Sequence, residues 1–274
     1  MCYYNGQKVS REEFIRLMAL EKEVSKYDFL NKDVHNGFAY GQIAVLKPNK
    51  TKDNFEIVQM EWGFLGHFLQ TREEAMVYRA GHKDATGKWI PAIPNLNAKG
   101  ENLFISERTN RKSIFADAAR NGRCLILSTG FFEWQHIYPK NKKTGAPLKT
   151  AVTYPYYINM REDEYFFMAG IYQEWTDKST GEIVETVAIV TAPGNELMAE
   201  LHNTKKRMPA ILTPDLAWEW MMDDLTDERI QEIALTQYDY KKMQACSVAK
   251  DFKESLSPAE PFKYEELPAL QFNI

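Results

Sequence analysis

A cysteine stands at position 2, directly after the initiator methionine. Methionine aminopeptidases remove Met1 when the next side chain is small, and removal leaves Cys2 with a free α-amine beside its thiol. An amine with a pKa of about 7.7 forms an imine with an aldehyde at neutral pH, and the neighbouring thiol then closes a five-membered thiazolidine. Taken alone, a cysteine after the initiator is more often an accident of sequence, so this interpretation depends on other residues.

Metal and disulfide chemistry have little support in the sequence. The five histidines (His35, His67, His82, His136 and His202) lack the spacing that places two ligands on one metal. The three cysteines include no Cys-x-x-Cys pair, and Cys124 and Cys246 lie in apolar runs where they are expected to be buried. The sequence therefore predicts no metal and no cofactor.

The elements that must position Cys2 are short. Residues 2 to 8 read as a strand, and Ser10 with Glu13 forms a capping box for a helix. Residues 66 to 100 show little periodicity and are expected to form a long loop, with a short helix at 113 to 119. Further strands are predicted at 38–46, 55–64, 123–134, 156–160, 165–172, 183–191, 208–212 and 242–248, and helices at 194–201, 214–222 and 226–235.

This order of elements predicts an α+β fold in which a curled, mostly antiparallel and barrel-like sheet carries peripheral short helices. We expect one domain over residues 1–274, with a core at about 2–250 and a surface tail at 255–274. With 44% hydrophobic and 26% charged residues, the composition is that of a soluble globular protein. No apolar run is long enough for a membrane helix and no secretory signal is visible, so we expect a cytoplasmic, monomeric protein.

Several separated segments resemble the SOS-response-associated peptidase (SRAP) family, whose members crosslink to abasic sites in DNA. Cys2 matches the family's N-terminal nucleophile, Glu61-Trp62-Gly63-Phe64 is similar to its Trp-Gly-Leu segment, and residues 97–101 are similar to its Asn-Ala-Arg-x-Glu. Residues 123–126 with 130–134 resemble its Arg-Cys-Leu-Ile and Gly-Phe-Tyr-Glu-Trp, and His202 with Arg207-Met208-Pro209 resembles its His…Arg-Met-Pro. The matches occur in the family's order.

The chain also departs from the family's pattern. The family commonly begins Met-Cys-Gly-Arg-Phe, whereas Tyr3 and Tyr4 stand here, so the phosphate-facing arginine is missing. Lys99 replaces an arginine and loses its bidentate fork, and residues 203–206 are inserted between His202 and Arg207. We therefore expect the DNA contacts to be redistributed.

The resemblance implies catalytic roles for Cys2, Asn97, Glu133 and His202. Glu133 lies in an apolar, aromatic segment, so burial should raise its pKa and suit it to proton transfer as the sugar ring opens and the imine forms. His202 is expected to move protons to the ring oxygen or a leaving phosphate, and Asn97 to orient the substrate or the amine. Without the family, these three residues read equally as a solvent-facing glutamate, a structural histidine and a turn asparagine.

The DNA contacts are expected from the basic middle of an otherwise acidic chain, whose net charge is -4. Cationic side chains would meet phosphates, and aromatic side chains would stack on bases next to the lesion. The DNA-binding candidates are Trp62, Lys99, Arg108, Arg111, Trp134 and Arg207, with Phe64, Lys205 and Lys206 nearby in the same reading.

The sequence thus predicts a DNA-repair protein that joins Cys2 to abasic sites in single-stranded DNA as a thiazolidine, and that associates with the nucleoid when it is bound to damaged DNA. Self-removal of Met1 and AP-lyase activity are possible side reactions. An N-terminal cysteine peptidase or amidohydrolase is the alternative, with Cys2 as thiolate, His202 as base and Asn97 in an oxyanion site. A non-covalent nucleic-acid binder is a third candidate, whose binding would be indifferent to Cys2.

Overall fold

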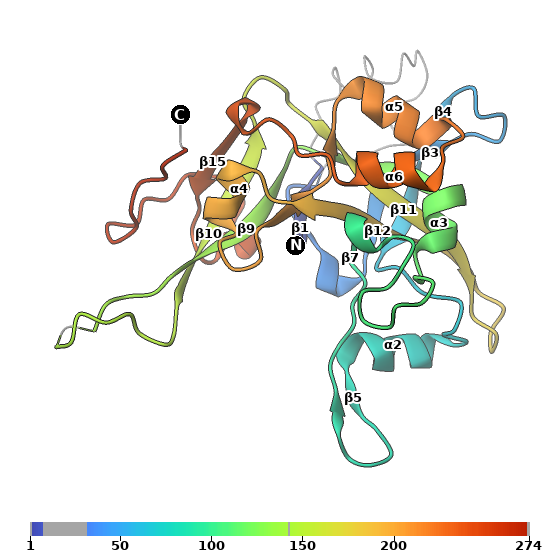
Figure 1. Ribbon diagram of the computed structural model, residues 1–274, viewed down its shortest axis with the longest axis horizontal. Helices are drawn as coiled ribbons and strands as arrows, with labels where there is room; N and C mark the ends of the chain where they lie inside the picture. The colour runs from blue at the N-terminus through green and yellow to red at the C-terminus, as the bar shows by residue number, and fades with distance from the viewer. Residues whose placement is uncertain (1, 8–31, 142, 273–274) are drawn as a thin grey trace.

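The computed structural model describes residues 2–7, 32–141 and 143–272, and Figure 1 shows how their strands and helices are arranged. The helix expected from Ser10 lies outside these residues. Two large sheets dominate the described chain, and a two-stranded hairpin stands apart from them. No helix in the described ranges is long and apolar enough to cross a membrane.

Five strands of the larger sheet form a closed ring. They are β3 (Gln42–Pro48), β4 (Phe55–Trp62), β8 (Arg123–Ser128), β11 (Phe166–Thr176) and β12 (Ile183–Pro193), and β12 pairs with both β4 and β11. The pairing of β12 with β4 is parallel and the other four pairings are antiparallel. The prediction of a curled, barrel-like and mostly antiparallel sheet in an α+β fold is therefore confirmed.

Three short strands extend this sheet at its margins. The strand β7 (Asn97–Lys99) pairs with β12 in parallel, whereas β13 (Arg207–Pro209) pairs with β12 in antiparallel fashion. The strand β14 (Ile211–Leu212) pairs with β11. This arrangement brings the segments around Asn97 and Arg207 to the same central strand, although more than 100 residues separate them in sequence.

The ring strands are buried on both faces, which explains their almost continuous apolar sequences. In β8, Cys124 and Ile126 point into one core cluster and Leu125 and Leu127 into another, as the alternation of side chains along a strand requires. The apolar run of residues 123–134 is divided between β8 and β9 (Gly130–Ile137), which are separated only by Thr129.

The second sheet has the order β15-β10-β9-β1-β2 and carries the N-terminus. Its strands are β1 (Tyr4–Gly6), β2 (His35–Asn36), β9, β10 (Val152–Met160) and β15 (Met243–Ser247), all paired antiparallel. Apolar side chains from this sheet and from the ring share one core cluster, to which Cys2 also belongs. The nucleophile predicted from the sequence therefore lies where the two sheets pack together.

Short helices cover the sheets on different sides. The helices α3 (Ala116–Asn121), α5 (Pro214–Met222) and α6 (Asp227–Ala234) pack on the ring, whereas α4 (Glu196–Leu201) lies beside β9 and β10 (Figure 1). Thr213 and Thr226 cap α5 and α6 through side-chain hydrogen bonds to backbone N–H groups. The described residues also form 3-10 turns at Gly37–Ala39, Gly100–Asn102, Tyr240–Lys242 and Phe252–Glu254.

The expected loop at residues 66 to 100 is wrong in part, because it contains the helix α2 (Arg72–Ala80) and the hairpin of β5 (His82–Lys83) and β6 (Trp89–Ile90). Only Ala75 and Arg79 of α2 are buried, while Met76 and Val77 face solvent. The helix therefore lacks the apolar stripe by which helices are recognised in a sequence. Thr71 caps its N-terminus.

Buried polar side chains anchor the N-terminal segment to the ring. The Gln7 amide donates hydrogen bonds to Ala44 O (2.9 Å) and Leu127 O (2.8 Å), and its oxygen accepts one from Ala44 N–H (3.0 Å). Asn5 accepts a hydrogen bond from the Ser128 hydroxyl. These contacts join β1 to β3 and β8, so they fix the strand that leads to Cys2.

We expect Gln7→Ala to lower the free energy of unfolding by about 3 kcal/mol, because it leaves three buried backbone groups without partners. Urea denaturation measures this change. Gln59→Ala removes an exposed glutamine and should stay within about 0.5 kcal/mol of the wild type. Equal stabilities of the two variants would contradict the anchoring role of Gln7.

Candidate active site

Cys2 is completely buried at the junction of the two sheets. Its thiol donates a weak hydrogen bond to Tyr4 O (3.5 Å), and its carbonyl accepts one from Asn97 Nδ2 (3.0 Å). Burial raises the pKa of the Cys2 thiol, and the nearby Glu133 carboxylate raises it further. The thiol is therefore protonated at neutral pH, which does not favour the thiolate that a cysteine hydrolase requires.

Glu133 reaches the same region from β9. Alternation along this strand places Glu133 on one face with Phe131 and Gln135, all of them buried, and places Trp134 on the other face with Phe132. Only 3% of Glu133 is exposed. Burial raises the pKa of Glu133 to about 7, so its carboxyl is poised to accept or donate a proton at neutral pH.

His202 faces Glu133, with 3.8 Å between His202 Nε2 and Glu133 Oε2. Burial lowers the pKa of His202 to about 4, so the imidazole is neutral at pH 7. Its Nδ1 lies 3.1 Å from Arg207 O, and because a carbonyl only accepts, the proton is on Nδ1 and the lone pair of Nε2 points toward Glu133. The acid form of Glu133 is thus a proton donor, and the neutral imidazole of His202 is a proton acceptor.

Arg207 does not lie on a DNA-binding surface. Its guanidinium is buried, where it donates to both carboxylate oxygens of Glu101 (2.5 and 2.9 Å) and to Thr191 O (2.7 Å). The prediction that Arg207 contacts DNA is therefore not supported. Its position instead fixes the carbonyl that orients His202.

Trp62 is likewise inside the fold, with 1% of its surface exposed, and Phe64 is fully buried. The Trp62 indole N–H donates to Leu96 O (3.0 Å), next to Asn97. Trp62 therefore cannot stack on a base in this structure, and it supports the start of β7. The side-chain oxygen of Asn97 is buried and has no hydrogen-bond partner among the residues that the structure describes.

The remaining predicted DNA contacts lie toward the surface. Lys99 is two residues beyond Asn97 in β7, and its ammonium pairs with Glu107 (3.1 Å) in the exposed turn that also carries Arg108 and Arg111. Trp134 is half-buried against Tyr4 and Phe252, on the face of β9 opposite Glu133. Lys99 and the exposed turn therefore extend from Asn97 toward the surface. Trp134 lies on the opposite face of β9 from Glu133.

An aromatic pair beside Cys2 was not predicted from the sequence. The rings of Tyr3 and Phe38 lie 4.8 Å apart, and 47% of Phe38 is exposed. Phe38 belongs to a 3-10 turn whose Gly37 N–H donates to Tyr3 O (3.0 Å). The pairing of β1 with β2 and this backbone contact bring residue 38 to residue 3, so no local sequence pattern could have predicted the aromatic pair.

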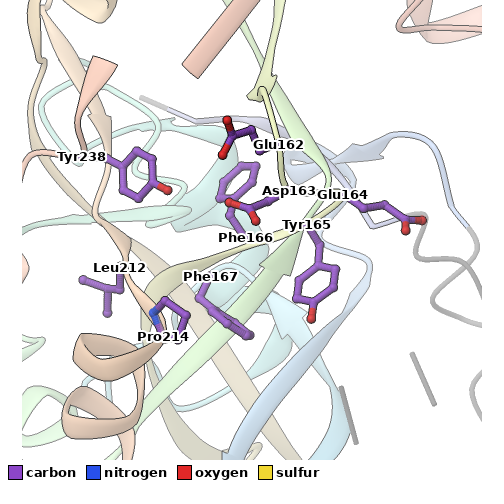
Figure 2. Close-up of a pocket in the computed structure, with 9 residues that line it drawn as sticks. All are labelled: Glu162, Asp163, Glu164, Tyr165, Phe166, Phe167, Leu212, Pro214 and Tyr238. Atoms are coloured by element: carbon purple, nitrogen blue, oxygen red, sulfur yellow. The ribbon is translucent and has the colours of Figure 1, made fainter. Parts of the chain in front are cut away.

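A separate pocket of about 450 Å³ contains none of the predicted site residues. Figure 2 shows Glu162, Asp163 and Glu164 at this pocket, together with the ring of Tyr238. Three carboxylates repel a phosphate backbone. This pocket is therefore not part of a DNA-binding site.

Cys124 is buried as expected, whereas Cys246 is only half-buried, and both are free thiols. Within residues 2–7, 32–141 and 143–272, no group of three or more His, Cys, Asp or Glu side chains is close enough to hold a metal ion.

Comparison with known proteins identifies the family of this chain. Residues 1–255 match the family model described as SOS response associated peptidase (SRAP). The abasic site processing protein YoqW of Bacillus subtilis is 30% identical over 154 residues, which are 56% of this chain and 59% of YoqW. The abasic site processing protein YMR114C of Saccharomyces cerevisiae is 27% identical over 222 residues, which are 79% of this chain and 48% of that protein. The matches thus span less than two thirds of the length of these relatives.

Solved structures share the fold. A protein from Bacteroides thetaiotaomicron superposes with a TM-score of 0.71 at 27% identity, and the match covers 95% of this chain and 97% of that one. A protein from Bordetella bronchiseptica superposes with a TM-score of 0.62 at 16% identity, covering 90% and 100% of the two chains, which shows a common fold alone.

The opposite pKa shifts of Glu133 and His202 predict opposite pH dependences of stability. Because the folded pKa of Glu133 is about 7 and its ordinary value is 4.5, the wild type should lose about 3 kcal/mol relative to Glu133→Gln as the pH rises from 4.5 to 8. Because the pKa of His202 falls from 6.5 to about 4, the wild type should lose stability relative to His202→Asn as the pH falls through this range. Urea denaturation at pH 5 and pH 8 measures both differences, and pH-independent differences would refute the burial argument.

Proposed function

Since this chain belongs to the SOS response associated peptidase family, we propose that Cys2, once Met1 has been removed, bonds covalently to the aldehyde of abasic sites in single-stranded DNA. The observation that carries this proposal is the position of Cys2 beside Glu133, whose pKa of about 7 suits proton transfer to and from a sugar. The printed names of the relatives, abasic site processing proteins, support the choice of lesion.

The chemistry proceeds in two condensations. The Cys2 amine attacks the aldehyde carbon of the ring-opened deoxyribose, and the carbinolamine loses water to give an imine. The thiol then adds to the imine carbon and its proton passes to the nitrogen, which closes a thiazolidine. The net result is one new C–N bond, one new C–S bond and one released water. A protonated thiol is suited to the second step, because its proton is needed on the nitrogen.

Glu133 and His202 move the protons of these steps. In its acid form, Glu133 protonates the departing hydroxyl of the carbinolamine, and the proton that the nitrogen loses as the imine forms restores the acid. Neutral His202 Nε2, which faces Glu133, relays the proton from the attacking amine nitrogen to the aldehyde oxygen as the carbinolamine forms. Asn97 holds the backbone at Cys2 through one side-chain atom and offers its free oxygen to the sugar through the other.

The same residues support limited side reactions. An imine allows β-elimination of the 3′ phosphate, so AP-lyase activity accompanies the crosslink, and the Glu133 and His202 pair can reopen the ring. Peptidase activity is confined to the removal of Met1 by the protein itself. We further propose that the protein acts as a monomer in the cytoplasm.

The DNA strand is held on the surface around the site. Lys99, Arg108 and Arg111 meet backbone phosphates, and the exposed ring of Phe38, packed on Tyr3, stacks on a base next to the lesion. Stacking of this kind needs an unpaired base, which is consistent with a preference for single-stranded DNA.

The central prediction is that the Met1-free protein forms a denaturation-resistant adduct with an abasic single-stranded oligonucleotide. Its intact mass should equal the sum of the two reactants less one water. Cys2→Ala keeps the amine but lacks the thiol, so its imine should survive denaturation only after reduction with borohydride. If wild type and Cys2→Ala give the same stable adduct without reduction, the proposal is wrong.

The hydrolase alternative is distinguished by the same proteins. A thiolate hydrolase would cleave peptide or amide substrates and form no adduct with DNA. A non-covalent binder would bind abasic and intact strands equally, and Cys2→Ala would leave its binding unchanged.

Phe38→Ala should weaken binding of abasic single-stranded DNA about tenfold, since stacking on an aromatic side chain contributes about 1–3 kcal/mol per base. Fluorescence anisotropy with a labelled oligonucleotide measures the affinity. Trp218 has the same exposed fraction as Phe38, 47%, but lies on α5, so Trp218→Ala is the matched control and should bind as the wild type does. A comparable loss in both variants would argue against a specific stacking site.

A further inference from the structure

The loop of residues 203–206 leads from α4 to β13 and is fixed against β9 beside the proposed site. Asn203 accepts a hydrogen bond from His136 N–H (3.0 Å) and donates one to His136 O (2.8 Å), three residues beyond Glu133. At the other end of the loop, Lys206 N–H donates to His202 O (2.7 Å) and Lys206 O accepts from Gly194 N–H (2.7 Å). The loop therefore has a defined position next to Glu133 and His202.

Lys205 projects from this loop into solvent. No ion-pair partner of Lys205 is found in the described part of the chain, whereas Lys99, Lys112 and Arg207 are paired with Glu107, Asp117 and Glu101. Lys205 is close enough for its charge to lower the pKa of both Glu133 and His202. An unpaired cation thus stands at the edge of the site.

Residues 3 and 4, which directly follow Cys2, carry no positive charge. Tyr4 stands where the family commonly has an arginine, and its ring is buried against Trp134 and Phe252. A strand whose abasic sugar reaches Cys2 brings its phosphates to the rim of the site, where a cation lowers the cost of placing negative charge beside the Glu133 carboxylate.

We propose that Lys205 binds the DNA phosphate next to the abasic sugar and that Asn203 positions it by holding the loop on β9. The inference rests on the proposed function, because it assumes that DNA approaches Cys2. It adds a binding residue on the inserted segment, which takes over the role of the missing arginine.

The test measures non-covalent binding, so that it does not depend on the reaction of Cys2. The probe is a labelled single-stranded oligonucleotide with a tetrahydrofuran abasic analogue, which has no aldehyde. Lys205→Ala should weaken its binding roughly three- to tenfold at low salt, and the slope of log affinity against log salt should become shallower by about 0.7. Lys205→Arg should restore both values. Lys178, an exposed lysine in the turn between β11 and β12, provides the control variant Lys178→Ala, which should match the wild type.

A double-mutant cycle tests the role of Asn203. Asn203→Ala should weaken binding on its own, and in combination with Lys205→Ala the two losses should be less than additive, because the loop position matters only through the lysine. If Lys205→Ala keeps the affinity and salt slope of Lys178→Ala, the inference about Lys205 is wrong even where Cys2 forms its adduct. If the wild type forms no Cys2 adduct while Lys205→Ala lowers the salt slope, the crosslinking proposal fails and Lys205 remains a phosphate contact.

Discussion

The three hydrogen bonds of Gln7 to the backbone of β3 and β8 are the contact on which the site depends. A nucleophile at the start of a chain sits where proteins are usually least ordered. Here residues 4–6 are paired on both sides by β2 and β9, and Asn97 holds the Cys2 carbonyl. Cys2 is thereby held in place as a core residue is, and the nucleophile that we propose has a fixed position.

Burial of that end has an electrostatic consequence. Removing Glu133 and His202 from water shifts the pKa of each toward its neutral form, upward for the carboxyl and downward for the imidazole. If the same two residues were exposed, the glutamate would be an ionised carboxylate at neutral pH and would have no proton to give. The stability lost by desolvating both groups is thus linked directly to the acid-base chemistry that we propose.

Much of this arrangement could be predicted from the sequence. The strands have long apolar or alternating runs and Thr226 marks a helix start, so the α+β fold could be predicted. Family motifs predicted Cys2, Asn97, Glu133 and His202, and the structure brings these four together. The sequence could not show that Trp62 and Arg207 are buried. Both have the residue types of DNA contacts, but the Trp62 indole donates to a backbone carbonyl and the buried Arg207 guanidinium pairs with the exposed Glu101. Helix α2 was not predicted because its large apolar residues Met76 and Val77 face solvent. The pair of Tyr3 and Phe38 was not predicted because it depends on tertiary contact alone.

The enclosed position of Cys2 also governs how the protein can be handled. Any peptide fused ahead of residue 2 converts the amine into an amide, and it must also pass out of a fully buried site between two sheets. Affinity tags and fluorophores belong instead near the surface tail, where Leu256 is 99% exposed. A label ahead of residue 2 would therefore remove the amine on which the proposed chemistry depends.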